Sequence, residues 1–109
     1  EELHALYLGR RGQLLHHACL SRGSSHNTIV DPHSIFRLGL LTGASRLILA
    51  HNHPSGDPRA SPEDIAATRR VADAGRLLGL PLVDHLILAG GRWTSLAEEG
   101  LLPGPHWAG

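Results

Sequence analysis

Two short apolar runs, separated by a segment of helical periodicity, constrain the fold of this chain more than any other feature. Residues 46–50 (RLILA) and 82–89 (LVDHLILA) have the length and the aliphatic content of buried strands. Between them, residues 62–78 place apolar side chains at helical intervals and direct most of their charged side chains toward water. Strands that alternate with a helix in this way predict a sheet that is covered by helices.

The flanking segments extend the pattern. Residues 3–8 and 14–20 read as a hairpin of two strands around a five-residue turn that contains two glycines. A polar loop is expected at 21–28, a helix that starts at Asp31-Pro32 and ends at Gly43, and a short last strand at 92–95. The order strand, strand, helix, strand, helix, strand, strand predicts an α/β fold with a mixed β-sheet covered by helices.

Composition excludes several classes of function. Ten basic and ten acidic side chains leave no net charge to attract nucleic acid or a membrane surface. All ten basic residues are arginine, which rules out a Schiff-base lysine and a Walker-type phosphate loop. Cys19 is the only cysteine, so neither an internal disulfide nor a Cys-rich zinc module can form. No apolar run approaches the roughly 20 residues of a membrane-spanning helix and no signal peptide is visible, so we expect a cytoplasmic protein.

Length and apolar content fit one small domain. The chain has 109 residues, of which 41% are hydrophobic, enough for a single core. It starts at Glu1 without a methionine, so we expect residues 1–109 to be a single domain cut from a longer protein. The Pro- and Gly-rich segment 101–109 is expected to be a loose tail.

The residues of greatest chemical interest follow the apolar run 46–50. The segment from His51 to Ala60 holds two prolines and a glycine, so it is expected to be a loop. His51 and His53 lie two apart, so in an extended segment both side chains point the same way and can meet at one ion. Asp64 shares a helical stripe with core-facing side chains, so its carboxylate is expected to point toward the sheet. Two imidazoles and one carboxylate are a common ligand set for catalytic Zn²⁺, with water in the fourth position. The metal lowers the pKa of that water to about 7, which supplies hydroxide at neutral pH.

Each of these residues also has an ordinary structural interpretation. A His-x-His pair means little in a chain with nine histidines. Ser61-Pro62-Glu63-Asp64 has the pattern of a helix start, with Ser61 as N-cap and Asp64 at the third position, and capping alone would explain both residues. The combination of a histidine pair after a buried strand, a Pro-Ser-Gly loop and an inward carboxylate favours a metal site.

The spacing His-x-His, seven residues, Ser, two residues, Asp is the metal motif of the JAB/MPN (JAMM) metallopeptidase family, and residues 51–64 match it at every defined position. The string HNHPSGDP, with Leu-x-Asp-His at 82–85, resembles the RadC branch, and the likeness extends over residues 3–100. The resemblance implies a cytidine-deaminase-like, three-layer α/β fold and a zinc site ligated by His51, His53 and Asp64. It also implies that Ser61 hydrogen-bonds near the metal as a catalytic residue that helps to stabilise an oxyanion.

One departure from the family pattern concerns the general base. The family has a glutamate on an early strand that takes a proton from the zinc-bound water, and we expect its position near Ala18 or Cys19. No glutamate occurs between residues 3 and 62. General-base help is worth about 10² to 10⁴ in rate, so zinc could be bound while peptide hydrolysis is very slow. Cys19, His16 and His17 are the candidate substitutes, whereas Glu63 is expected to be solvated.

The remaining histidines have plainer readings. His16 and His17 are typical of core or surface positions rather than of ligands, and His4 reads as a surface residue. His85 alternates with apolar neighbours on a buried strand, so we expect a hydrogen-bonded structural histidine there, with a place near the zinc left open. Asp84, on the other face of that strand, is expected to pair with an arginine.

Three functions compete. The leading one is a zinc-dependent peptidase or isopeptidase that acts on a peptide or protein substrate, and its rival is a zinc-binding scaffold or sensor without peptidase activity. A metal-dependent nuclease is the third, but neutral charge and the lack of lysine supply no evident phosphate-binding groove. RadC-like proteins usually carry an N-terminal helix-hairpin-helix segment that contacts DNA; these 109 residues contain none, so we expect no DNA contact from them.

Overall fold

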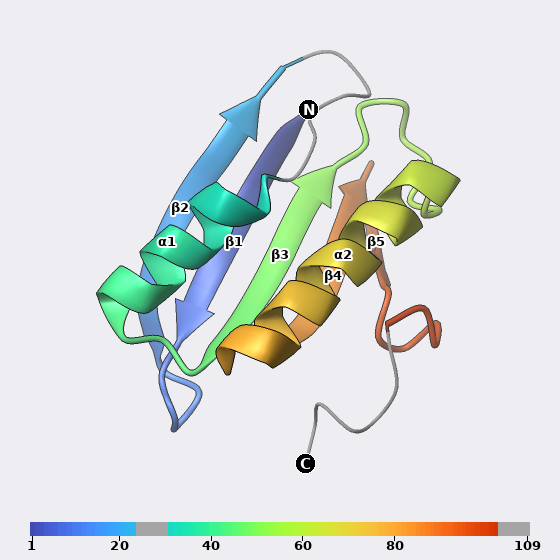
Figure 1. The fold of residues 1–109 in the computed structure, drawn as a ribbon. Helices are drawn as coiled ribbons and strands as arrows, with labels where there is room; N and C mark the ends of the chain where they lie inside the picture. The colour runs from blue at the N-terminus through green and yellow to red at the C-terminus, as the bar shows by residue number, and fades with distance from the viewer. Residues whose placement is uncertain (24–30, 103–109) are drawn as a thin grey trace.

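The computed structural model describes residues 1–23 and 31–102. They form five strands and two helices in the order that the sequence predicts (Figure 1). The elements are β1 Glu2–Leu8, β2 Leu14–Arg22, α1 Pro32–Thr42, β3 Arg46–Asn52, α2 Pro62–Leu78, β4 Leu82–Ala89 and β5 Arg92–Ser95. The expected polar loop and loose tail fall mainly on 24–30 and 103–109, which lie outside the described residues.

The strands form one mixed sheet in the order β2-β1-β3-β4-β5. β3 and β4, the two apolar runs, are parallel and are connected by α2, whereas all other neighbouring strands are antiparallel. The hairpin between β1 and β2 closes through a turn in which Gly12 has a φ of 78° and the Gly9 N–H donates to the Gln13 carbonyl at 2.9 Å. The predicted α/β fold with a mixed sheet covered by helices is therefore confirmed.

Strand β3 runs further than predicted. The sequence places a loop from His51 to Ala60, but β3 includes His51 and Asn52. The reason is pairing on both sides: His51 lies opposite Leu3 of β1 and Ile87 of β4. The loop prediction is wrong for these two residues, and His51 is held by the sheet itself.

Strand β2 also exceeds its predicted end at residue 20, because Ser21 and Arg22 continue the pairing with β1. Arg22 lies opposite Glu2, and its Nε is 3.4 Å from Glu2 Oε2. A register irregularity between Leu3 and His4 interrupts this ladder. The polar composition of residues 21 and 22, which suggested a loop, reflects an edge strand instead.

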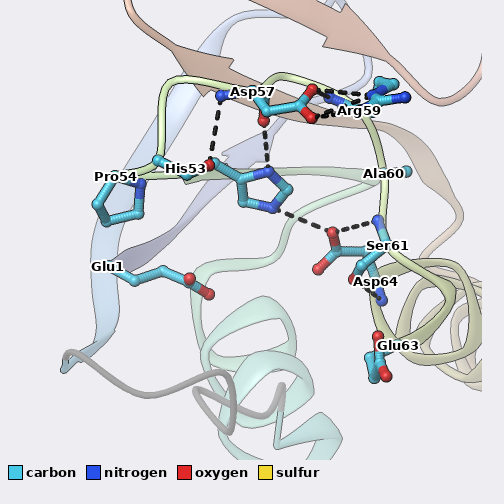
Figure 2. A pocket seen from close by; sticks show the side chains of 10 residues that line it. Glu1, His53, Pro54, Asp57, Arg59, Ala60, Ser61, Glu63 and Asp64 are labelled. Carbon is cyan, nitrogen blue, oxygen red and sulfur yellow. Dashed lines mark hydrogen bonds and ion pairs between the residues drawn. The ribbon is translucent and has the colours of Figure 1, made fainter.

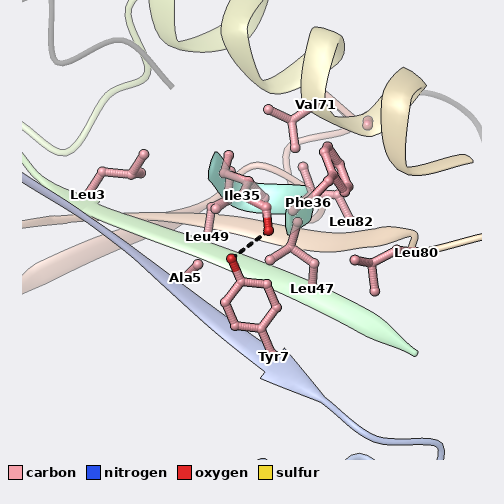
Figure 3. Close-up of a cluster of buried hydrophobic side chains, with 11 residues drawn as sticks. Leu3, Ala5, Tyr7, Ile35, Phe36, Leu47, Leu49, Val71, Leu80 and Leu82 are labelled. Carbon is pink, nitrogen blue, oxygen red and sulfur yellow. Dashed lines mark hydrogen bonds between the residues drawn. The ribbon is translucent and has the colours of Figure 1, made fainter. Parts of the chain in front are cut away.

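Both helices lie on the same face of the sheet (Figure 1). Asp31 caps α1 by accepting the backbone N–H of His33, and Gly43 ends the helix at a φ of 71°. The core lies between helices and sheet, and the Tyr7 hydroxyl within it donates to the Ile35 carbonyl at 2.7 Å (Figure 3). The larger side chains in this core are those of Leu3, Tyr7, Ile35, Phe36, Leu47, Leu49, Val71, Leu80 and Leu82.

The described residues thus supply two layers, a sheet and a helical layer, of the three-layer arrangement that the resemblance implies. No helix in the described part of the chain is both long and apolar enough to cross a membrane.

Candidate metal centre

His51 and His53 converge because of how β3 ends. Alternation along β3 places His51 on the helix-covered face, with Leu47 and Leu49, and leaves it only 5% exposed. The chain then continues beside β4, where the His53 N–H donates to the Leu88 carbonyl at 2.8 Å. As a result the two Nε2 atoms lie 3.0 Å apart.

Asp64 reaches the same point from the first turn of α2. Ser61 and Asp64 form a reciprocal capping box, in which Ser61 Oγ accepts the Asp64 N–H and the Asp64 carboxylate accepts the Ser61 N–H. Asp64 Oδ2 lies 3.1 Å from His53 Nε2 (Figure 2), and Oδ1 lies 3.3 Å from His51 Nε2. One ligand atom from each of the three residues therefore falls within 4.8 Å of the others. Asp64 therefore caps α2 and lies beside the two histidines at the same time.

The proton on His53 is assigned by its backbone partner. His53 Nδ1 lies 2.8 Å from the Asp57 carbonyl oxygen, which can only accept (Figure 2). Nδ1 must therefore carry the proton, and in the neutral ring Nε2 presents a lone pair toward Asp64. Metal-binding histidines are commonly oriented in this way through the other ring nitrogen.

The proton on His51 follows from a buried chain of hydrogen bonds. The Thr68 hydroxyl donates to the Asp64 carbonyl at 2.6 Å, so it accepts from His85 Nδ1, which is 2.7 Å away. His85 Nε2 is then the acceptor for His51 Nδ1 at 2.7 Å. His51, like His53, is left with an unprotonated Nε2 that faces the carboxylate.

The charges of the buried groups fit this assignment. Burial, assisted by the nearby His51, lowers the pKa of His85 to about 3, so its ring is neutral near pH 7. Burial alone would raise the pKa of Asp64, but a proton carried by the His51 ring toward the carboxylate, together with the Ser61 backbone N–H, outweighs burial and holds the pKa well below the usual range. The carboxylate is thus stabilised when a cation, here a proton, occupies the space between it and His51. Three electron-pair donors that face one another need a cation between them, either protons or a metal ion.

Sequence reasoning missed Thr68 and left the position of His85 open. His85 is the expected buried, hydrogen-bonded histidine, and it lies directly behind His51. Thr68 is four residues after Asp64, so it shares the inward stripe of α2, which is the signal that could have found it. Asp84 has other partners than the expected arginine: its carboxylate accepts from the Ser95 hydroxyl and the Ala97 N–H.

A surface groove opens beside the triad. His53, Ser61 and Asp64 line it, and the carboxylates of Glu1 and Glu63 line it as well (Figure 2). His51 lies behind them, buried. A molecule in this groove would meet one imidazole, one hydroxyl and one carboxylate of the candidate centre.

The substitutes considered for the missing glutamate do not face the triad. Cys19 lies opposite His4 on the outer face of the hairpin, and His17 contacts His4 there at 2.8 Å. His16 lies beside Tyr7, which pairs with Leu47 near the other end of β3 from His51. Of the two positions expected for the family's glutamate, Ala18 is the one that faces the helices, since it pairs with buried Ala5 and packs against the core.

Comparison with known proteins gives matches along nearly the whole chain. The profile of the RadC-like JAB domain matches residues 1–101. A UPF0758 protein of Methanococcoides burtonii is 42% identical over 102 residues, which cover 94% of this chain and 44% of that protein. UPF0758 proteins of Symbiobacterium thermophilum and Listeria monocytogenes are 41% and 39% identical over 95% and 92% of the chain, and over 44% and 45% of their own lengths. The chain thus spans less than half the length of these curated relatives.

Proposed function

Because this chain belongs to the RadC-like JAB domain family, we propose that it holds one Zn²⁺ between His51, His53 and Asp64 and hydrolyses an amide bond of a peptide or protein. The observation that carries the proposal is the meeting of two imidazole nitrogens and one carboxylate within 4.8 Å of one another. Two histidines and a carboxylate leave a fourth tetrahedral position for water, which is the composition of a catalytic zinc site.

The residues around the centre have defined tasks in this mechanism. The Asp57 carbonyl and the His85 ring hold the two ligand imidazoles in one tautomer and one orientation. The Ser61 N–H fixes the Asp64 carboxylate. A bound zinc ion would supply Lewis acidity, polarising the carbonyl and lowering the pKa of a bound water to about 7.

Ser61 is proposed as the second catalytic group. Its oxygen accepts the Asp64 N–H at 3.0 Å, which leaves the hydroxyl proton free to be donated into the groove. A donor aimed at the oxygen of a scissile carbonyl stabilises the negative charge that develops there. The same hydroxyl would then cap the helix and serve the reaction.

A zinc-binding scaffold without peptidase activity is the second candidate, and Ala18 favours it. Ala18 faces the helices in the region where the family's glutamate is expected, and an alanine cannot accept a proton. General-base assistance contributes about 10² to 10⁴ in rate, so this chain could hold metal and still turn over very slowly. We propose a cytoplasmic location for both candidate functions. One cysteine allows no internal disulfide within these residues, and disulfides are rare in the cytosol.

Metal content tests the centre that both candidates share. We expect the purified chain to hold an equivalent of zinc that is lost on His53→Ala and retained on Glu63→Gln, the matched change of a neighbouring carboxylate. Incubation of the zinc-loaded chain with a library of short peptides, followed by mass spectrometry, then separates the candidates. Cleavage that stops on chelation supports the peptidase, intact peptides support the scaffold, and a chain that holds no zinc contradicts both.

A further inference from the structure

A second group of metal-ligand side chains lies on the opposite face of the sheet. Glu2 and His4 alternate with the buried Leu3 and Ala5 on β1, so they point away from the helices. Cys19 lies opposite His4 on β2 and points the same way. One ligand atom each from Glu2, His4 and Cys19 falls within 4.8 Å of the others.

His4 is at the centre of this outer cluster, and both of its ring nitrogens have partners. Its Nε2 lies 2.8 Å from Glu2 Oε1, and its Nδ1 lies 2.8 Å from His17 Nε2. With no metal, a proton on Nε2 satisfies Glu2. When a cation displaces that proton to solvent, Nδ1 takes up the proton that it shares with His17 Nε2, and the exposed His17 ring takes a proton from solvent at its other nitrogen. Nε2 and Oε1 then become two ligand atoms that face each other. The Cys19 thiol must also lose its proton to bind as a thiolate.

The outer cluster is open to solvent and held by the hairpin. The side chains of His4 and Glu2 are 29% and 43% exposed, and Cys19 is exposed. Arg22 contacts the other carboxylate oxygen, Oε2, at 3.4 Å, which leaves Oε1 toward His4. The strand pairing already fixes the backbone positions of all these residues, so the chain loses little conformational entropy when an ion binds.

We propose that Glu2, His4 and Cys19 form a second zinc site, with His17 as the residue that positions His4. The mixed imidazole, carboxylate and thiolate set suits Zn²⁺, with water in the fourth tetrahedral position, and the sulfur disfavours Mg²⁺ and Ca²⁺. This site shares no residue with His51, His53 and Asp64, so it stands or falls independently of the proposed hydrolase function.

Sulfur makes the second site spectroscopically separable from the first. Co²⁺ replaces Zn²⁺ in tetrahedral sites, and a thiolate ligand adds an intense sulfur-to-cobalt charge-transfer absorption that nitrogen and oxygen ligands lack. Titration of the 109-residue chain with Co²⁺ should produce this band in the parent and in His53→Ala. It should be absent in Cys19→Ser, an exposed change that the fold can accept.

Zinc stoichiometry supplies the second measurement. We expect two equivalents in the parent, one in His53→Ala, one in Cys19→Ser and none in the double variant. His17→Ala should weaken the second equivalent about 10- to 100-fold, as loss of a residue that orients a ligand typically does. His16→Ala is the matched control, because this neighbouring histidine lies beside Tyr7 on the helix-covered face.

Two results would overturn the second site. One is a parent chain with no charge-transfer band at saturating Co²⁺. The other is a band or a second zinc equivalent that survives in Cys19→Ser or His4→Ala, since either would place the metal elsewhere. Circular dichroism of each variant shows whether the hairpin is intact; a folded Cys19→Ser chain that keeps both zinc ions refutes the assignment directly.

Discussion

Thr68 links the helix that carries Asp64 to the histidine that orients His51. Its hydroxyl donates to the Asp64 carbonyl and accepts from His85, and the side chain is fully buried. We predict that Thr68→Val, which keeps the shape but removes the hydroxyl, weakens zinc binding at the candidate centre about 10- to 100-fold. Competition with a chromophoric chelator measures the affinity.

The control for this change lies in the other helix. The Thr42 hydroxyl lies against the Leu38 carbonyl four residues before it in α1, as that of Thr68 lies against the Asp64 carbonyl in α2. Its other partner among the described residues is the Gly39 carbonyl, not a histidine. Thr42→Val should therefore leave zinc affinity unchanged. Equal loss in both variants would mean that the effect comes from the helix bond rather than from the proton chain through His85.

At the scale of single elements, the first turn of α2 shows one residue with two proposed tasks. Ser61 is the N-cap of α2, and we propose it as an oxyanion donor as well. Glycine is tolerated at N-caps at a cost of only a few tenths of a kcal/mol relative to serine, whereas alanine costs about 1 kcal/mol. Ser61→Gly should therefore keep stability, measured by urea unfolding, close to that of the parent while it removes the hydroxyl.

Activity then isolates the second task. Ser61→Gly is introduced into a form of the chain that cleaves peptides, either the parent or a variant with a restored general base. If the hydroxyl stabilises an oxyanion, the substitution should lower kcat by roughly 10²- to 10³-fold. Ser61→Ala should lower both kcat and stability. If the Ser61→Gly chain keeps the parental kcat, Ser61 acts only as the N-cap of α2 and does not stabilise an oxyanion.

Close packing of α2 on the segment that leads into β4 depends on Gly75. A Cβ at position 75 would collide with the backbone carbonyl oxygen of Leu80, whereas one at Gly39 would meet the Leu80 side chain. Alanine in place of glycine usually stabilises a helix by about 1 kcal/mol, but overpacking costs about 1–3 kcal/mol. We predict that Gly75→Ala lowers the free energy of unfolding in urea and that Gly39→Ala lowers it less, because a side chain can move. A stabilised Gly75→Ala chain would contradict the rigidity of this contact.

At the scale of the whole molecule, the predictable features are those encoded by local spacing. The strands, both helices, the shared direction of His51 and His53 and the inward direction of Asp64 follow from alternation, helical stripes and capping residues. The meeting of Asp64 with the two histidines, 11 and 13 positions before it, was predicted with the help of the spacing of the family motif. The contact of His85 with His51 does not follow from such local patterns, because it depends on the parallel register of β3 and β4, which no short stretch of sequence specifies.

The outer cluster of Glu2, His4 and Cys19 could not be predicted from the sequence for a similar reason. His4 and Cys19 are 15 positions apart in sequence, and only the pairing of β1 with β2, with its irregularity beside His4, places them opposite each other. Read singly, each is an ordinary surface residue. The pairing of β1 with β2 brings residues that are distant in sequence into one cluster, and this pairing cannot be predicted from sequence periodicity alone.

The register of the whole sheet also decides which position could restore a general base. Ala18 lies opposite Ala5, which lies opposite Leu49, two residues before His51 on the same face. Two strand spacings of about 5 Å and an offset of two residues along the strand separate the two backbone positions by about 12 Å, a gap that a glutamate and the His51 ring shorten from opposite sides. We predict that Ala18→Glu raises zinc-dependent peptide cleavage about 10²- to 10⁴-fold over the parent, at some loss of stability because a carboxylate enters a partly buried position.

The neighbouring residue provides the matched control for this prediction. Cys19→Glu introduces the same side chain one position further along β2, but it points to the outer face and should leave cleavage at the parental rate. Cleavage assays on zinc-loaded, folded variants measure the difference. If Ala18→Glu binds zinc and cleaves no faster than Cys19→Glu, the missing glutamate does not explain low activity, and the scaffold role is favoured. If Ala18→Glu alone gains activity, the chain carries a hydrolytic centre that lacks one carboxylate.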